Sequence, residues 1–197
     1  MKKVSQIMFV LMAAFLLAGC AMEKEVAEQG NSVQIAKDGS IVGTLVNVLD
    51  QSYYNADELK TMIESEISQV NTSQGDNAVA LEKYDCDSAG NVKVKIKYAD
   101  SAAYTAFNGG TFFSGAAVTA KDTYGLKGNF LDVKDGKLTT EDAVVSEDAK
   151  VVILSENINV SVPGKIVAIT DNVEITGKKS ASVGLKDEED LAYIVYK

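Results

Sequence analysis

Residues 92–98 read Val-Lys-Val-Lys-Ile-Lys-Tyr, a strict alternation of apolar and charged side chains. Successive side chains of a β-strand point to opposite faces of its sheet, so this stretch predicts a strand with one face on a core and the other in solvent. The solvent face carries the three lysines Lys93, Lys95 and Lys97. A second β-type run at residues 78–84 precedes this strand, and the polar residues 85–91 between them predict the loop of a β-hairpin.

The residues before the hairpin predict a helix and a further strand. Residues 41–49 are rich in β-branched side chains and apolar on both faces, which is typical of a central strand covered on both sides. Asn55, followed by the acids Asp57 and Glu58, predicts the start of a helix. Five apolar residues follow at helical spacing, and we expect the first four to be buried against the strand that begins at Ile41. These five are Leu59, Met62, Ile63, Ile67 and Val70.

A short helical turn at residues 101–107 and a strand at residues 111–119 complete the first half of the chain. With the preceding elements they predict an α+β unit in which a helix lies on a mostly antiparallel sheet. Beyond residue 125, short β-type runs recur without a helical period and are separated by turn residues. This spacing predicts an all-β meander, closed as a small barrel or packed as a sandwich. The runs are 130–133, 151–154, 158–162, 166–169, 173–175 and 192–196.

The first 19 residues have the layout of a secretory leader. Lys2 and Lys3 precede an uncharged apolar run at residues 7–18, which is shorter than the roughly 20 residues that span a bilayer. The leader ends in Leu17-Ala18-Gly19-Cys20, which resembles the lipobox of bacterial lipoprotein signals. The resemblance implies a diacylglyceryl group on the Cys20 thiol, cleavage immediately before Cys20, and attachment by this lipid to the extracytoplasmic face of the cell membrane. The alternative is an ordinary signal peptide in which Cys20 is incidental.

These features divide the chain into four parts. They are a lipoprotein signal peptide at 1–19, a lipidated flexible tether at 20–38, the α+β unit at 39–125 and the all-β unit at 126–197. The tether is expected because residues 21–38 are rich in polar side chains and have few apolar ones. Whether the two folded units share one core is left open. The mature part resembles the small lipoproteins of anaerobic Gram-positive bacteria.

The residue types that are missing restrict the chemistry of the chain. The sequence has no histidine and no arginine, because all 19 basic residues are lysine. Histidine-dependent hydrolysis, histidine-ligated zinc and a guanidinium clamp on phosphate are therefore excluded. Without Lys2 and Lys3 the mature chain has 17 lysines and 28 acids, a net charge of −11, and such a surface repels nucleic acid. We expect no cofactor, no metal and no catalytic residue.

Three local features have both a functional and a structural interpretation. Residues 85–91 resemble the start of a calcium-binding loop, but Ala89 stands where an oxygen ligand belongs, so a plain hairpin turn is favoured. The acidic run at 187–190 is interpreted as a solvated turn rather than a calcium site. Cys86, the single thiol besides Cys20, is interpreted as a half-buried cysteine beside a turn, with a redox or intermolecular disulfide site as the alternative.

Two groups of side chains could bind a ligand. The three lysines of residues 92–98 could hold an anionic wall polymer or a lipid head group, whereas a solvated sheet face or a guarded sheet edge is the favoured interpretation. Five aromatic residues that lie close together in the sequence could line a sugar-binding face, but packing of the short helix on the sheet explains them more simply. They are Tyr98, Tyr104, Phe107, Phe112 and Phe113.

The sequence thus favours a non-enzymatic envelope lipoprotein whose head binds or scaffolds an envelope protein or glycan. One alternative is a carboxylate-dependent hydrolase of glycosidase type, which needs two acidic side chains at the rim of one cleft. Another is a ligand-binding module lined by the aromatic residues, which needs those rings to be exposed in a concave patch.

Overall fold

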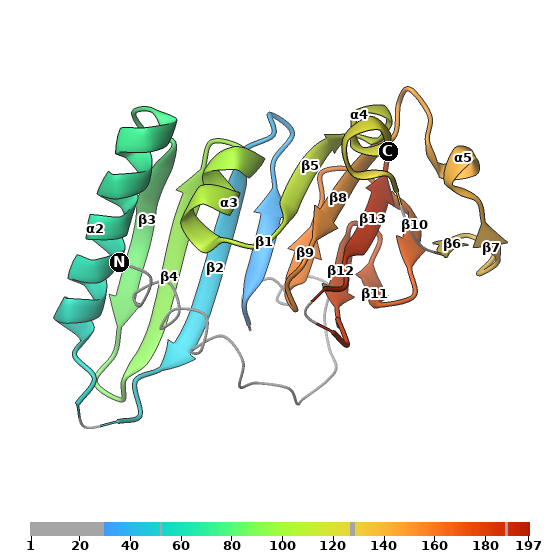
Figure 1. The fold of residues 1–197 in the computed structure, drawn as a ribbon. Helices are drawn as coiled ribbons and strands as arrows, with labels where there is room; N and C mark the ends of the chain where they lie inside the picture. The colour runs from blue at the N-terminus through green and yellow to red at the C-terminus, as the bar shows by residue number, and fades with distance from the viewer. Residues whose placement is uncertain (1–29, 52, 127–128, 188) are drawn as a thin grey trace.

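The computed structural model describes residues 30–51, 53–126, 129–187 and 189–197, so the predicted leader and Cys20 lie outside the described residues. The described chain has the predicted α+β fold, with helices packed on two β-sheets (Figure 1). The strand order is β11-β12-β9-β1-β2-β4-β3 in the seven-stranded sheet and β5-β8-β13-β10-β6-β7 in the six-stranded sheet. Neither sheet closes into a barrel among the described residues. A small barrel was one of the two architectures predicted for the meander, and it does not form there.

The seven-stranded sheet takes strands from both halves of the chain. Antiparallel pairs join β1 to β2, β2 to β4 and β4 to β3, whereas β1 and β9 run parallel. The strands are β1 (Ser32–Ile35), β2 (Ile41–Val48), β3 (Val79–Cys86), β4 (Asn91–Tyr98), β9 (Asn159–Ser161), β11 (Val173–Gly177) and β12 (Ser180–Val183).

The predicted tether contains a strand, which corrects the expected boundary at residue 38. β1 pairs along its whole length with β2, and its first three residues also pair with β9. Val33 and Ile35 are buried, whereas Gln34 between them is exposed. This short alternation is a strand signal, but the polar composition of the surrounding segment hides it.

The long helix α2 (Ala56–Gln74) begins where the sequence predicts. The Asn55 side chain caps it by accepting hydrogen bonds from the backbone N–H groups of Asp57 and Glu58. The helix lies against β3 and α3 rather than against β2, because β4 and β3 separate β2 from that side of the sheet. Ile63 is buried as predicted, but Met62 is 43% exposed, so its predicted burial is wrong.

The segment after the hairpin contains two helices instead of one. α3 (Ser101–Asn108) starts at Asp100, whose carboxylate accepts from the backbone N–H of Ala103. The strand predicted at 111–119 is shorter: β5 (Phe112–Ala116) leads directly into α4 (Ala117–Tyr124). The small residues Ala117 and Ala120, one helical turn apart, are fully buried against the six-stranded sheet, which explains why the chain turns helical here.

The six-stranded sheet also crosses the predicted boundary at 125/126. β5 from the first predicted unit pairs with β8 from the second, as β1 does with β9 in the other sheet. The two predicted units therefore share both sheets. Besides β5 this sheet contains β6 (Phe130–Asp132), β7 (Leu138–Thr139), β8 (Lys150–Leu154), β10 (Ile166–Thr170) and β13 (Ala192–Tyr196), and the short helix α5 (Glu141–Val144) follows β7.

Two hydrophobic clusters hold these layers together. The larger lies on one face of the seven-stranded sheet and joins it to α2 and α3 at one end and to the six-stranded sheet at the other. The smaller lies on the opposite face of the six-stranded sheet, under α4 and α5. We call the face of the seven-stranded sheet on the larger cluster its inner face and the opposite face its outer face.

Candidate functional site: the outer face of the seven-stranded sheet

The outer face is polar on most strands of the sheet, whereas on β2 it also carries Val42, Val46 and Val48. Its members follow from the strand registers, because residues directly opposite each other on neighbouring strands point to the same face. Lys97 lies opposite Val42, Lys95 opposite Thr44 and Lys93 opposite Val46. The face continues across the remaining strands as Ser32, Gln34, Asn159, Ser161, Ser180, Ser182 and Glu174, and on β3 as Lys83 and Asp85.

Most side chains of the outer face are accessible. Gln34, Lys97 and Glu174 are exposed, and the serines on β9 and β12 are half-buried. Ser32 and Thr44 in the middle of the face are the exception, because they are only 7% and 6% exposed. The face is therefore a broad surface of hydroxyl, amide and ammonium groups, suited to hydrogen bonding with a polar partner.

The three lysines form one row on this surface. Lys93 and Lys95 are half-buried and Lys97 is exposed, on the side of β4 away from the core, as the alternation predicts. β4 pairs with β2 on one side and β3 on the other, so the suggestion that these lysines guard a sheet edge is wrong. The carboxylate of Asp85 forms an ion pair with Lys83, and Lys83 lies directly opposite Lys95.

The predicted aromatic group lies in the core, as the simpler interpretation expected. Tyr98, Tyr104, Phe107 and Phe112 are buried, and Phe113 is half-buried. The Tyr98 ring meets the Tyr104 ring edge-on, with 4.8 Å between the ring centroids. Gly43 on β2 leaves room for the Tyr98 ring, because a Cβ atom at residue 43 would lie 3.2 Å from that ring. These rings are not available to a sugar.

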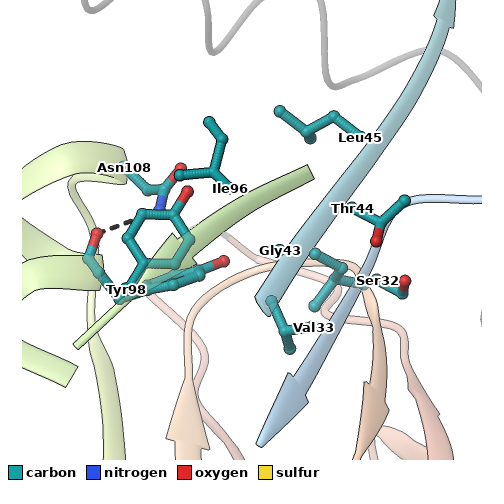
Figure 2. Close-up of a pocket in the computed structure, with 10 residues that line it drawn as sticks. Ser32, Val33, Gly43, Thr44, Leu45, Ile96, Tyr98 and Asn108 are labelled. Atoms are coloured by element: carbon teal, nitrogen blue, oxygen red, sulfur yellow. Dashed lines mark hydrogen bonds between the residues drawn. The ribbon is translucent and has the colours of Figure 1, made fainter. Parts of the chain in front are cut away.

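A small pocket lies beside these tyrosines and is lined by residues of β1, β2, β4 and α3 (Figure 2). Its volume is about 10 Å³, roughly what a single water molecule needs. Its lining contains no carboxylate, so it lacks the paired acids that a glycosidase requires. The lining residues are Ser32, Val33, Gly43, Thr44, Leu45, Ile96, Tyr98, Tyr104, Asn108 and Ile158.

Sequence reasoning missed the buried carboxyl group of Glu156, which lies in the loop between β8 and β9. Its side chain is 7% exposed, and the Tyr104 hydroxyl donates a hydrogen bond to Oε2 at 3.1 Å. Oε1 has no hydrogen-bond partner among the described residues. Burial raises the pKa of Glu156 to about 7, against the smaller lowering effect of the Tyr104 hydrogen bond.

The acidic segments named in the sequence form turns. In the β3–β4 hairpin, the Asp87 carboxylate accepts from the backbone N–H groups of Ala89 and Asn91 and from the Asn91 side chain, which confirms the hairpin interpretation. These hydrogen bonds lower the pKa of Asp87. In the run at 187–190, of which residue 188 is not described, the backbone N–H of Asp187 donates to the Asp190 carboxylate. No group of three metal-ligating side chains occurs among the described residues.

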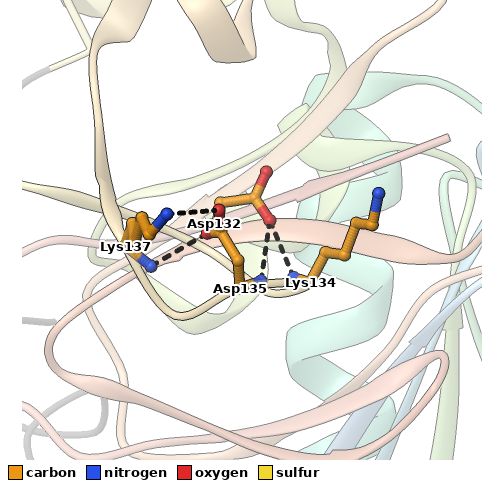
Figure 3. A network of polar contacts seen from close by, with 4 residues as sticks. All are labelled: Asp132, Lys134, Asp135 and Lys137. Carbon is orange, nitrogen blue, oxygen red and sulfur yellow. Dashed lines mark hydrogen bonds and ion pairs between the residues drawn. The ribbon is translucent and has the colours of Figure 1, made fainter.

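Charged side chains also order the β6–β7 turn (Figure 3). Asp132 accepts from the backbone N–H groups of Lys134 and Asp135 at 2.7 and 3.3 Å, and Asp135 accepts from the backbone N–H of Lys137 at 3.0 Å. The Lys137 ammonium lies 3.7 Å from the same carboxylate. Each acid is engaged with its own turn, so this network is structural.

Cys86 lies at the end of β3 and is exposed rather than half-buried. Its Sγ donates a weak hydrogen bond to the carbonyl oxygen of Asp87 at 3.6 Å. A cysteine with a single backbone contact is not by itself a reactive site.

Comparisons of the chain with protein-family models, with curated proteins and with solved structures found no match. Among the described residues, no helix combines the length and the apolar character needed to cross a membrane.

Proposed function

We propose that the protein is an extracytoplasmic lipoprotein, anchored to the cell membrane by lipid on Cys20, whose folded head binds another component of the cell envelope without catalysing a reaction. The observation that carries this proposal is the outer face of the seven-stranded sheet. Its strands present hydroxyl, amide and ammonium groups on one side, interrupted by the valines of β2, while most of their apolar side chains lie in the core. A polar partner of similar extent would meet many hydrogen-bonding groups at once.

Binding fits the chemistry of the chain better than catalysis does. Histidine and arginine are missing, and among the described residues the one acid with a strongly raised pKa, Glu156, is enclosed beside Tyr104 in the core. The pocket lined by Tyr104 has room for about one water molecule. The hydrolase and the aromatic-lined module therefore lack a supporting observation in the described residues.

The anchor is tested by replacing Cys20 with serine. Serine lacks the thiol that takes the diacylglyceryl group, so Cys20→Ser should move the protein from the membrane fraction to the soluble fraction. Mass spectrometry of the purified parent protein should find the lipid on Cys20. A free thiol on residue 20 of the mature parent would contradict the proposed anchor.

The binding face is tested with a matched pair of substitutions. The mature chain is made with Cys20→Ser, so that lipid does not hold it, and is sedimented with purified envelopes. Gln34→Trp places a bulky ring in the middle of the outer face, where Gln34 is exposed, and should reduce co-sedimentation. Gln69→Trp makes the same change on the exposed surface of α2 and should leave it unchanged. Equal retention of both variants would overturn the assignment of this face.

A further inference from the structure

We propose that the loop between β8 and β9, residues 155–158, is a latch controlled by a proton. In the closed loop the protonated side chain of Glu156 lies inside the protein. When Glu156 loses its proton, its side chain turns out to solvent and the loop opens. This inference does not depend on the proposed function, because it rests on the contacts of the loop itself.

The place that the Glu156 carboxyl group occupies suits its neutral form and not its ionised form. The residue is 7% exposed, and Oε2 accepts a hydrogen bond from the Tyr104 hydroxyl. Oε1 has no partner among the described residues. A carboxylate removed from water needs several donors or a cation to replace its hydration. Loss of the proton therefore favours a state in which the carboxylate has left this place.

The way out of the protein is short. Ser155 on one side of Glu156 is half-buried, and Asn157 on the other side is exposed. Among the described residues, neither Glu156 nor Asn157 forms a hydrogen bond between its backbone and another backbone group. The carboxylate can therefore reach water through a local change of the loop, while the paired strands on either side stay in place.

Both ends of the loop are fixed, so the opening is confined to its middle. The backbone N–H of Ser155 donates to the carbonyl oxygen of Thr111 at 3.0 Å, and its Oγ accepts from the Thr111 backbone N–H at 2.9 Å. At the other end Ile158 is 5% exposed in the larger hydrophobic cluster. Its carbonyl oxygen accepts from the backbone N–H of Val183 at 3.1 Å.

Two side-chain contacts hold the middle of the closed loop. One is the hydrogen bond from the Tyr104 hydroxyl to Glu156, which joins the loop to α3. In the other, the Asn157 side chain accepts from the backbone N–H of Leu185, which joins the loop to the segment after β12. Opening breaks the first contact, and because Asn157 is the next residue, it disturbs the second as well.

Glu156 is the group whose charge sets the state of the loop. The titratable groups that face it are Tyr104 of α3 and Tyr98 of β4, and burial raises the pKa of both further above their ordinary value of 10. In the closed loop, burial raises the pKa of Glu156 to about 7. A carboxylate that escapes to water is easier to form, so the midpoint of the opening lies between the ordinary value of 4.5 and about 7.

The Tyr104 hydroxyl distinguishes a latch from a carboxylate that stays inside. If the loop opens, this hydrogen bond stabilises only the closed, protonated state, so its removal lowers the midpoint. If the carboxylate stays enclosed, the hydrogen bond stabilises the ionised form more than the neutral form, so its removal raises the midpoint. The two cases differ in the sign of the effect.

The test follows the Glu156 carboxyl carbon and the Leu185 amide of the mature Cys20→Ser chain by NMR from pH 4 to 8.5. Both signals should change together, with one midpoint between 4.5 and about 7. Tyr104→Phe should lower this midpoint by roughly 0.5–1 pH unit, the size of one net hydrogen bond. Asn157→Ala removes the other contact of the closed loop and should also lower it, and this variant decides the matter if Tyr104→Phe does not fold.

Two further variants serve as controls. Glu156→Gln cannot ionise and should abolish the change of the Leu185 amide with pH. Glu147→Gln removes an acid from an exposed position before β8 and should leave that change as in the parent. The inference is overturned if the midpoint rises or stays the same in Tyr104→Phe and Asn157→Ala, or if the carboxyl carbon titrates while the Leu185 amide does not change. A carboxyl midpoint at or below 4.5 would also overturn it, because Glu156 would then have no preference for the closed loop.

Discussion

At the scale of single residues, Glu156 is the clearest departure from what the sequence predicts. The dipeptide Glu156-Asn157 has the composition of an exposed turn, and Asn157 is indeed exposed, with its side chain accepting from the backbone N–H of Leu185. Glu156 instead points inward to the Tyr104 hydroxyl. The contact joins residues 52 positions apart, and no local pattern could have predicted it.

The raised pKa of Glu156 predicts a specific dependence of stability on pH. The folded carboxyl has a pKa of about 7 against an ordinary value of 4.5, so the folded state binds the proton more tightly than the unfolded state does. The contribution of this group to the free energy of unfolding should therefore be largest below pH 4.5 and fall by roughly 3 kcal/mol as the pH rises through 7. The groups facing it are Tyr104 and, nearby, Tyr98, whose pKa values burial also raises, so neither titrates in this range.

The Glu156→Gln variant isolates this contribution. Glutamine keeps an oxygen that can accept from Tyr104 but does not ionise, so the loss of stability between pH 4.5 and 7 should be smaller than in the parent. Urea unfolding across pH 4 to 8.5 measures both curves. Parallel curves for the two proteins would show that Glu156 is not the group responsible.

At the scale of elements, the sequence predicts most strands and the two helices that precede β5. The alternation at 92–98 is confirmed as β4, and six runs in the second half correspond to strands. The misses have physical reasons. β1 and β12 each bury only two apolar side chains, so their strand patterns are short. α4 buries small alanines rather than a large apolar face. Met62 is exposed because the side of α2 that contacts β3 and α3 is narrower than the apolar pattern of the helix suggests.

Neighbouring residues of α2 provide a test of how this helix packs. Ile63 is 5% exposed and belongs to the larger cluster, so Ile63→Ala should lower the free energy of unfolding by about 2–5 kcal/mol. Met62→Ala, at a residue 43% exposed, should change it by less than about 0.5 kcal/mol. Similar losses at both positions in urea unfolding would contradict this orientation of the helix.

β1 provides a second test, because the same residues were expected to form a flexible tether. Ile35 is 3% exposed in the larger cluster, and Ile35→Ala should cost about 2–5 kcal/mol of unfolding free energy. The adjacent exposed Gln34→Ala should cost less than about 0.5 kcal/mol. If both variants unfold like the parent, residues 32–35 behave as a tether and β1 is not part of the folded head.

At the scale of the whole molecule, the sequence predicts the class of fold but not its connectivity. β1 lies between β2 and β9, and β5 joins β8, so each sheet combines strands that are far apart in the chain. Local patterns indicate that a strand forms and which side it buries, but its neighbour depends on packing of the complete chain. The outer face therefore emerges only from the topology, which places the predicted lysines of β4 on one surface with serines of β9 and β12.

The most direct measurement is the mapping of amide chemical shifts of the mature Cys20→Ser chain on titration with solubilised fragments of purified envelopes. We expect the shifts to change along β2, β4 and β3 and to extend to Gln34 on β1. The amides of α2 and of the β6–β7 turn, which lie away from the outer face, should not change. Saturable changes confined to those two elements, with the outer face unaffected, would contradict the account.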